Sequence, residues 1–251
     1  MTTPKIALVT GASSGIGKAC ATALLNDGWQ VVFVGRRAEL LDQAIAEAGS
    51  AGSRGVAMPC DVADEDAVAA LFESVKQRFG RLDLLFNNAG ISLPTTLPGD
   101  YDPKVWRQAV DINLNGAFFC LSQAFKLMQT QAPQGGRIIN NGSISAHAPR
   151  PGSIAYTATK HAISGLTKTA ALDGRPFDIA VGQIDIGNVA SDMTAKMVTG
   201  MPQADGSVRP EARMDMSAVV ETFMAMARLP LSANILFTTV MATKMPFVGR
   251  G

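Results

Sequence analysis

The chain has 251 residues, of which 47% are hydrophobic and 17% are charged, so it is long enough to bury a sizeable core. This composition excludes extensive disorder, because disordered chains combine low hydrophobicity with high net charge. The 22 basic and 21 acidic residues leave a net charge of +1. Without a run of lysines and arginines, the sequence argues against binding to nucleic acid or to an anionic membrane.

No stretch reaches the ~18 consecutive apolar residues of a membrane-spanning helix. The apolar segment Ile6–Val9 leads directly into a glycine-rich loop, without the apolar core and cleavage site of a signal peptide. We therefore expect a cytoplasmic protein. The three cysteines, Cys20, Cys60 and Cys120, are odd in number and far apart, which fits neither a disulfide framework nor a metal site. We expect them to be small buried residues, with no bound metal.

Short aliphatic runs alternate with longer stretches of helical period, which is typical of an α/β fold with a parallel sheet. The expected strands are Lys5–Thr10, Gln30–Gly35, Arg54–Cys60, Leu82–Phe86, Arg137–Asn141, Ile179–Ile184 and Asn234–Thr239. The expected helices are Ile16–Asp27, Ala38–Ala48, Asp64–Phe79, Pro103–Met128, Ser153–Leu172 and Ser217–Arg228. Seven strands with crossover helices predict one doubly wound sheet of Rossmann type, with helices on both faces.

Helix ends are marked at several positions. Asp64 is a predicted N-cap, and Gly28, Gly49 and Gly80 are placed to end three helices. No repeat or linker divides the chain, so we expect a single domain over residues 1–251. The long irregular segment 188–214, interrupted by prolines and a glycine, predicts a functional or mobile substrate loop.

A glycine-rich loop follows the first expected strand and opens the first helix. Its spacing, Gly-x-x-x-Gly-x-Gly, differs from the Gly-x-Gly-x-x-Gly of the ordinary dinucleotide fingerprint. Backbone N–H groups and the positive helix end would meet there at a pyrophosphate, and glycines would let the backbone approach it. The expected cofactor-binding residues of this loop are Gly11, Ser13, Ser14, Gly15, Ile16 and Gly17. The alternative is a tight turn without a ligand.

In proteins that bind NAD(H), a carboxylate at the end of the second strand binds the ribose hydroxyls. This chain has no carboxylate there, and the strand ends in Gly35, Arg36 and Arg37. A guanidinium pairs with a 2′-phosphate, and no acidic side chain repels it. The sequence therefore predicts a preference for NADP(H), with NAD(H) still possible. Arg36 is the first candidate for the phosphate contact and Arg37 the second, and the alternative is two solvated arginines at a helix start.

Tyr156 and Lys160 are four residues apart in an expected helix, so their side chains share one face. The ammonium would favour the phenolate and make the tyrosine a usable acid/base near neutral pH. Taken alone, this pair also fits a surface of an amphipathic helix. Ser143 lies thirteen residues upstream at the end of the fifth strand, where its hydroxyl could hold a carbonyl oxygen near Tyr156.

Together these residues resemble the short-chain dehydrogenase/reductase family over essentially the whole chain. The family pattern Thr-Gly-x-x-x-Gly-x-Gly matches Thr10–Gly17, its Asn-Asn-Ala-Gly matches Asn87–Gly90, and its Asp-Val matches Asp61–Val62. The catalytic residues of the family fall on Asn113, Ser143, Tyr156 and Lys160.

The resemblance implies hydride exchange between nicotinamide C4 and a carbonyl or carbinol carbon. Tyr156 would be the proton donor in reduction, Ser143 would polarise the oxygen, and Lys160 would bind the nicotinamide ribose. Asn113 would hold a water that links Lys160 to solvent; a helix-internal amide bonded to backbone is the alternative.

The resemblance also implies further cofactor contacts. Asp61 and Val62 would flank the adenine, while Asn88, Ala89 and Gly90 would line the crevice near the ribose. For Asn87 we expect a structural role between strands.

One segment departs from the family pattern, because Ile186 stands where the family has Pro before Gly187. Gly187 and Val189 match, and Ser191 occupies the place of a threonine that binds the carboxamide. Loss of the proline restores an N–H and relaxes φ, so the nicotinamide-side loop could be placed differently.

The sequence signals for residues that would contact the substrate are less specific. Met193, Met197 and Met201 recur every four residues and predict one face of a helix, either a lid over an apolar substrate or a core or subunit contact. His147 could touch substrate, although a loop histidine without a chemical role is favoured. Arg150 has the same ambiguity.

The sequence thus predicts an oxidoreductase that transfers a hydride between NADP(H) and a ketone, aldehyde or secondary alcohol. By resemblance we expect a homodimer or homotetramer. A non-catalytic dinucleotide sensor or scaffold on the same fold is one alternative, and the intact catalytic set argues against it. Another is epimerisation or dehydration of a sugar nucleotide, but only about 65 residues follow Gly187 to form a substrate domain.

Overall fold

A computed structural model describes residues 4–248 of the chain. Its main feature is a seven-stranded sheet with the strand order β3-β2-β1-β4-β5-β6-β9. All six pairings in this sheet are parallel. The strands are β1 (Ile6–Thr10), β2 (Gln30–Gly35), β3 (Gly55–Pro59), β4 (Leu84–Asn87), β5 (Gly136–Asn141), β6 (Ile179–Ile186) and β9 (Phe237–Val240). The order reverses between β1 and β4, which creates a crevice at the carboxyl ends of the strands.

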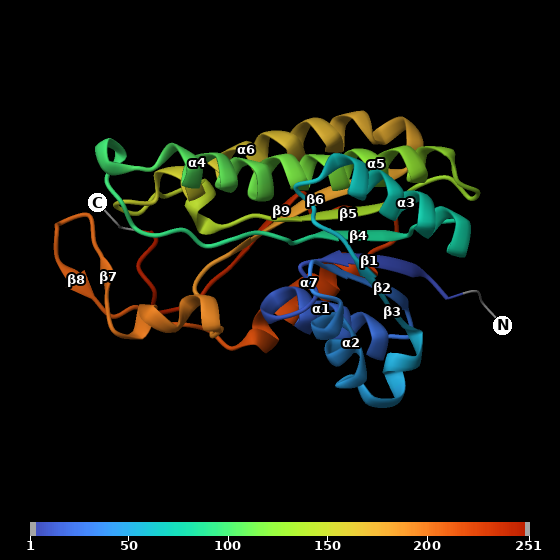
Figure 1. The fold of residues 1–251 in the computed structure, drawn as a ribbon, viewed down its shortest axis with the longest axis horizontal. Coiled ribbons are helices and arrows are strands. Elements are labelled where there is room, and N and C mark those ends of the chain that lie inside the picture. The colour runs from blue at the N-terminus through green and yellow to red at the C-terminus, as the bar shows by residue number, and fades with distance from the viewer. Residues whose placement is uncertain (1–3, 249–251) are drawn as a thin grey trace.

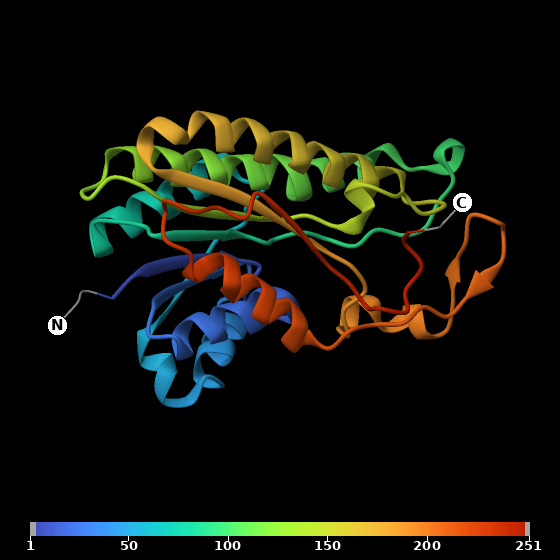
Figure 2. The ribbon, with the colours of Figure 1, turned by 180° about the vertical axis from the view of Figure 1, so that it is seen from behind.

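Helices cover both faces of the sheet. They are α1 (Gly15–Asn26), α2 (Ala38–Ala46), α3 (Glu65–Phe79), α4 (Pro103–Val110), α5 (Gly116–Thr130), α6 (Ile154–Asp173) and α7 (Met216–Arg228). Helices α3 to α6 lie on one face, and α1, α2 and α7 lie on the other (Figures 1 and 2). The doubly wound α/β fold predicted from the sequence is confirmed.

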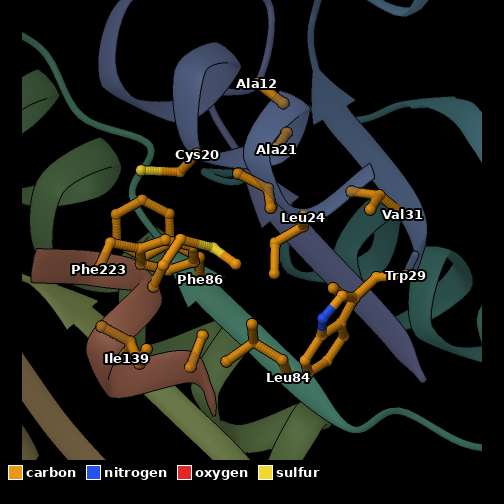
Figure 3. Close-up of a cluster of buried hydrophobic side chains, with 14 of the residues drawn as sticks. Ala12, Cys20, Ala21, Leu24, Trp29, Val31, Leu84, Phe86, Ile139 and Phe223 are labelled. Atoms are coloured by element: carbon orange, nitrogen blue, oxygen red, sulfur yellow. The ribbon is translucent and has the colours of Figure 1, made fainter. Parts of the chain in front are cut away.

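The central strands are buried on both faces because helices cover each side. Every residue of β1 and of β6 is buried. On the α1 and α7 face, Phe223 of α7 packs against Phe86 of β4 with ring centroids 4.5 Å apart, and Leu24 of α1 lies nearby (Figure 3). Full burial of such side chains stabilises the fold by about 2–3 kcal/mol each. The C-terminal helix α7 is thereby fixed to the first half of the chain.

Three of the four predicted helix-end signals, Asp64, Gly28 and Gly80, are confirmed. Asp64 Oδ1 accepts the N–H groups of Asp66 and Ala67, each at 3.0 Å, at the start of α3. Gly28, Gly49 and Gly80 have φ values of 89°, 59° and 74°. This left-handed conformation is one that glycine adopts without a steric penalty, which explains where α1 and α3 end. Helix α2 ends earlier, at Ala46, and Gly49 begins a 3₁₀ segment, Gly49–Arg54.

The helix predicted over Pro103–Met128 is confirmed in extent, because helical residues run without a break from Pro103 to Thr130. The structure places a π-helical segment, Asp111–Asn115, between α4 and α5. A π-bulge adds a residue to a helical turn, a feature that the sequence did not predict, and such bulges occur often at functional sites. Here the bulge contains Asn113, which is 3% exposed.

The segment 188–214 forms the most irregular part of the molecule. It contains a short 3₁₀ segment, Asp192–Val198, followed by an antiparallel hairpin of β7 (Met201–Pro202) and β8 (Val208–Arg209). In Figures 1 and 2 this hairpin projects from one end of the molecule, away from the helical layers. The single helical face predicted for Met193, Met197 and Met201 was wrong, because Met201 lies in β7.

Among residues 4–248, no helix is both long and apolar enough to cross a membrane.

Candidate functional site

A cavity of about 440 Å³ lies at the carboxyl ends of the central strands. The predicted site residues that line it are Gly11, Ser13, Ser14, Gly15, Ile16, Gly17, Arg36, Arg37, Asp61, Val62, Asn88, Ala89, Gly90, Ser143, Tyr156, Lys160, Gly187, Val189 and Ser191. Of the predicted set, Asn113 alone is not part of the wall. Residues far apart in the sequence therefore come together as expected from their motifs.

The glycine loop has the geometry of an anion site. Gly11 and Gly15 have φ values of 67° and 53°, and the position of a Cβ on Gly15 is open space. A Cβ on Gly17 would collide with the carbonyl oxygen of Gly11. Ser14 is the N-cap of α1 but makes no side-chain cap hydrogen bond. The first N–H groups of α1 thus remain available to a bound phosphate.

Thr10 and Asn88 fix this loop to the sheet. Thr10 Oγ1 accepts the N–H groups of Asn88 and Ala89, both at 2.9 Å, and Asn88 Nδ2 donates to Thr10 O at 2.8 Å. Asn141 Nδ2 donates to Asn88 Oδ1 at 2.8 Å, which adds β5 to the network. Asn88 therefore orders the cavity floor.

Asn87 has the structural role that was predicted. Its amide donates to Asn140 Oδ1 of the neighbouring strand β5, at 3.2 Å, and to Ala117 O of α5, at 2.7 Å.

At the end of β2, Arg36 and Arg37 are exposed and line the cavity. Neither forms a salt bridge with any residue in the described part of the chain. Both guanidinium groups are thus available to a phosphate. Asp61 Oδ1, on the neighbouring loop, accepts the N–H of Ala63 at 3.1 Å.

Cys60 lies beside this end of the cavity, 7% exposed. Burial raises the pKa of the Cys60 thiol to about 11, with the carboxylates of Asp61 and Asp64 adding to the effect. Cys20 and Cys120 are also free and buried, as expected. All three thiols therefore stay protonated near neutral pH.

The three side chains that are expected to be catalytic, Ser143, Tyr156 and Lys160, share the other half of the cavity. Ser143 follows β5, and its Oγ accepts the N–H of Ser145 at 3.1 Å, so the hydroxyl proton remains available to a substrate oxygen. Tyr156 and Lys160 lie on α6, and Lys160 Nζ is 5.6 Å from the centroid of the Tyr156 ring. Lys160 is 7% exposed and donates to Asn141 O at 2.7 Å. A buried ammonium thus lies beside the phenol.

Asn113 lies behind this wall rather than in it. Its Oδ1 accepts the N–H of Ile91 at 2.8 Å, and its Nδ2 donates to Ile91 O at 3.2 Å. The side chain thereby fixes the loop that follows Gly90. The Asn113 amide is thus bonded to backbone, which agrees with the structural role that was the alternative to a water relay. The water relay itself stays a prediction.

The replacement of Pro by Ile186 lets β6 continue. Ile186 pairs with Val240 of β9, and the N–H of Gly187 donates to Val240 O at 2.8 Å. A Cβ on Gly187 would approach Met245 Sδ to 2.7 Å, so the tail after β9 packs tightly here. The loop after β6 is therefore held by strand pairing and by the tail. This effect of Ile186 in place of proline was not predicted.

The half of the cavity that is expected to receive the substrate contains many apolar side chains. Its apolar wall residues include Ile91, Leu93, Pro94, Ile144, Pro151, Met197, Met201 and Pro202. Met197 and Met201 reach the cavity from the 3₁₀ segment and from β7 without sharing a helix, and we call the segment 188–214 that carries them the lid.

Arg150 anchors this lid, a role that the sequence left open. Arg150 Nη2 lies 2.6 Å from Glu211 Oε2 and donates to Asn188 Oδ1 at 2.9 Å. Glu211 also accepts from Asn188 Nδ2 at 2.7 Å and from Gln203 Nε2 at 3.0 Å. Burial works against ionisation, but these donors and the Arg150 charge hold the pKa of Glu211 below its ordinary value. The sequence analysis missed Glu211, because its partners are distant in the chain.

The doubly wound fold and the glycine loop define a dinucleotide-binding protein of Rossmann type. A family model described as short chain dehydrogenase matches residues 5–202, and the chain therefore belongs to this family.

Two relatives and two solved structures show the likeness. The chain is 44% identical over 169 residues to "3beta-hydroxysteroid dehydrogenase" of Mediterraneibacter gnavus, covering 67% of this chain and 60% of that protein. It is 37% identical over 196 residues to "3-oxoacyl-[acyl-carrier-protein] reductase" of Synechocystis sp., covering 78% of each. The alignment with the first relative thus spans less than two thirds of its length.

Among solved structures, ElxO with NADP bound superposes with a TM-score of 0.83 and 28% identity, covering 94% of this chain and 97% of the other. The 3-ketoacyl-(acyl-carrier-protein) reductase from Brucella melitensis complexed with NADH superposes with a TM-score of 0.83 and 25% identity, covering 94% and 96%. Nicotinamide dinucleotides are the cofactor class of the family, and the free helix end and glycine cradle of this chain fit such a group.

Proposed function

We propose that the protein is an NADP(H)-preferring oxidoreductase that interconverts a ketone or aldehyde and the matching alcohol. The observation that carries this proposal is the shared cavity, in which Ser143, Tyr156 and Lys160 face the same space as the free N-terminus of α1. The apolar substrate half favours a carbonyl compound with an apolar body.

The cofactor would lie along the carboxyl ends of the strands. The loop Gly11–Gly17 would bind its pyrophosphate, and Arg36, with Arg37 beside it, would bind a 2′-phosphate. Asp61 and Val62 would flank the adenine, while Asn88, Ala89 and Gly90 would line the ribose crevice.

The nicotinamide side would be formed by the loop after β6. Gly187, Val189 and Ser191 line the cavity there and would contact the nicotinamide end. When bound, the reduced cofactor supplies a hydride from nicotinamide C4 to the carbonyl carbon.

The side chains would handle the proton. Ser143 Oγ would donate a hydrogen bond to the carbonyl oxygen and polarise it. Tyr156 would donate its phenolic proton to that oxygen as the carbon accepts the hydride, and the reverse transfer would serve oxidation. Lys160, 5.6 Å from the ring centroid, would stabilise the phenolate and bind the ribose hydroxyls. A water held near Asn113 would return the proton from solvent.

The assay that tests this proposal follows the absorbance of the reduced cofactor with NADPH or NADH and a panel of apolar ketones, aldehydes and secondary alcohols. Turnover with NADPH preferred over NADH is the expected result. A protein that binds NADPH but turns over no member of the panel, with Tyr156→Phe changing nothing, would instead be a dinucleotide sensor or scaffold.

The proposal includes a homodimer or homotetramer. Large apolar side chains are exposed on the outer helices, namely Trp106 of α4, Phe118 of α5, and Ile154 and Leu172 of α6. Light scattering coupled to gel filtration is expected to give two or four times the 26.3 kDa of one chain, and Phe118→Asp is expected to lower that mass. A monomer at micromolar concentration would contradict this part of the proposal.

A further inference from the structure

Asp185 lies near the carboxyl end of β6 with its side chain fully buried. A buried carboxylate is costly unless donors satisfy its charge. Here Oδ1 accepts from the N–H of Ser143 at 3.0 Å and from Gln183 Nε2 at 2.7 Å. Oδ2 lies 2.8 Å from His147 Nε2. Asp185 thus contacts both ends of the turn that begins at Ser143.

The chain is shaped to admit this carboxylate. Gly142 directly precedes Ser143, and a Cβ at Gly142 would collide with Asp185 Oδ1 and approach Gln183 Nε2 to 2.6 Å. A side chain at residue 142 and a carboxylate at residue 185 therefore exclude each other. The contact with Asp185 therefore explains why residue 142 is a glycine, without any reference to the cofactor.

The turn itself sets the direction of the serine hydroxyl. The N–H of Ala146 donates to Ser143 O at 2.8 Å, and the N–H of His147 donates to Ile144 O at 3.0 Å. Within this turn Ser143 Oγ accepts the N–H of Ser145, which leaves its own proton to donate. Asp185 bonds to the first residue of the turn, Ser143, and to the last, His147. These two contacts hold the turn against β6.

The same carboxylate is connected to the helix that carries Tyr156. Gln183 Nε2, which donates to Asp185, also donates to Ser164 Oγ of α6 at 2.9 Å. Thr167 Oγ1 of α6 lies 2.9 Å from Gln183 Oε1. Asp185 and Gln183 therefore hold the Ser143 turn and α6 in one buried hydrogen-bonded unit.

We propose that Asp185 is a positioning residue for the reaction, which holds the Ser143 turn in register with α6 so that the Ser143 and Tyr156 hydroxyls reach one substrate oxygen. His147 is the second anchor of this turn, and this role replaces the loop histidine without function that the sequence favoured. The inference rests on the proposed function, because it concerns the oxygen on which both hydroxyls act.

The test compares Asp185→Ala, Asp185→Asn and His147→Gln in the full chain, with a substrate that the carbonyl panel identifies. Asp178→Asn is the matched control, because Asp178 is exposed and immediately precedes β6. Measurements are kcat, the KM of the substrate, NADPH affinity by fluorescence, and the melting temperature.

For Asp185→Ala we expect kcat to fall about 10- to 100-fold, since small displacements of reacting groups cost rate on this scale. NADPH affinity is expected to stay within about twofold, because the glycine loop is not part of this network. Asp185→Asn keeps the acceptor toward Ser143, so its loss is expected to be smaller, and His147→Gln smaller again. Asp178→Asn should retain full activity.

A double-mutant cycle separates positioning from general support of the fold. If Asp185 acts through Ser143, then Asp185→Asn in a Ser143→Ala background changes the residual single-turnover rate by less than about twofold. Equal losses in both backgrounds would overturn the inference, as would an unchanged kcat in Asp185→Ala. Should Asp185→Ala not fold, Asp185→Asn and His147→Gln carry the test. No turnover by the unaltered chain would overturn the proposed function and this inference with it, whereas an active chain with active Asp185 variants would overturn the inference alone.

Discussion

The two ends of the cavity are built in different ways. The cofactor end is formed by short contiguous motifs, such as Gly11–Gly17 and Asn88–Gly90, at the ends of strands that are buried on both faces. The expected substrate end combines residues after β4 and β5, such as Ile91 and Ile144, with the segment 188–214, which has a hairpin of two-residue strands and an isolated bridge, Val189 to Met214. Backbone conformation defines the first end, while a few side chains from distant segments hold the second.

This difference determines which residues of the two regions can be substituted. A glycine loop must keep its residues, because each glycine is needed for a positive φ or a close backbone approach. The loop 188–214 needs only anchors such as Glu211, Asn188 and Arg150, and the residues between them can change shape and size. We expect cofactor choice to depend on the first region and substrate choice on the second.

The largest effect is expected at the point where the two ends meet. Tyr156→Phe removes the proton donor, so turnover of any substrate is expected to fall by about 10³-fold, within the range for general acid catalysis. NADPH affinity, measured by fluorescence in the same variant, is expected to change little and serves as the control for folding. Turnover that stays near that of the unaltered chain would show that another group donates the proton.

The sequence predicted most of the fold, and the residues expected to bind the cofactor do line one cavity. The helix cap at Asp64, the glycines that end helices, and the loop Gly11–Gly17 act through local backbone geometry, which residue type encodes directly. The alternation of strands and helices predicted the parallel sheet, and therefore the crevice at the carboxyl ends of its strands.

The substrate end could not be predicted in the same way. Glu211 and Arg150 are 61 residues apart, and no local pattern indicates that they pair. The π-bulge that contains Asn113 was not predicted either, because no local sequence signal marked the extra residue in that turn. Asp185 stands in a buried strand, where a carboxylate requires partners that only the tertiary structure reveals.

A second prediction concerns how well the adenosine end is shielded. Because burial raises the pKa of Cys60 from 9.0 to about 11, the native chain holds about a hundredfold less thiolate there than an ordinary cysteine near neutral pH. Cys20 and Cys120 are more deeply buried. Alkylation by iodoacetamide at pH 7.5 is therefore expected to be at least about a hundredfold slower in the native chain than in urea. Rapid labelling of one native thiol, located by mass spectrometry, would contradict this.

At the same end, Arg36→Ala is expected to weaken NADPH binding by about 10- to 100-fold, since a hydrogen bond to a charged group contributes about 1.5–3 kcal/mol. NADH affinity should not fall, because NADH has no 2′-phosphate. Arg175→Ala, which removes an exposed arginine just before β6, is the matched control for net charge. Equal losses for NADPH and NADH would place Arg36 outside phosphate recognition, and a loss confined to Arg37→Ala would move the contact by one residue.

The smallest effect is expected at the lid. Glu211→Gln leaves the Arg150 charge buried without its partner, which costs about 1–3 kcal/mol. If the lid opens locally while the sheet stays folded, substrate KM is expected to rise roughly five- to tenfold and proteolysis within 188–214 to become faster, with NADPH affinity unchanged. Glu221→Gln, on the exposed face of α7, is the control.

The pH dependence of the lid distinguishes the ion pair from simple packing. Since the folded pKa of Glu211 lies below its ordinary value, the stabilisation is present above the unfolded pKa of about 4.3 and is lost as pH falls through the folded pKa. Proteolysis of the loop 188–214 by an acid-active protease should therefore accelerate below about pH 4 in the unaltered chain. In Glu211→Gln the loop should already be open, with little further change over that range. An identical pH profile in both chains would mean that apolar contacts, and not the Arg150–Glu211 pair, hold the lid closed.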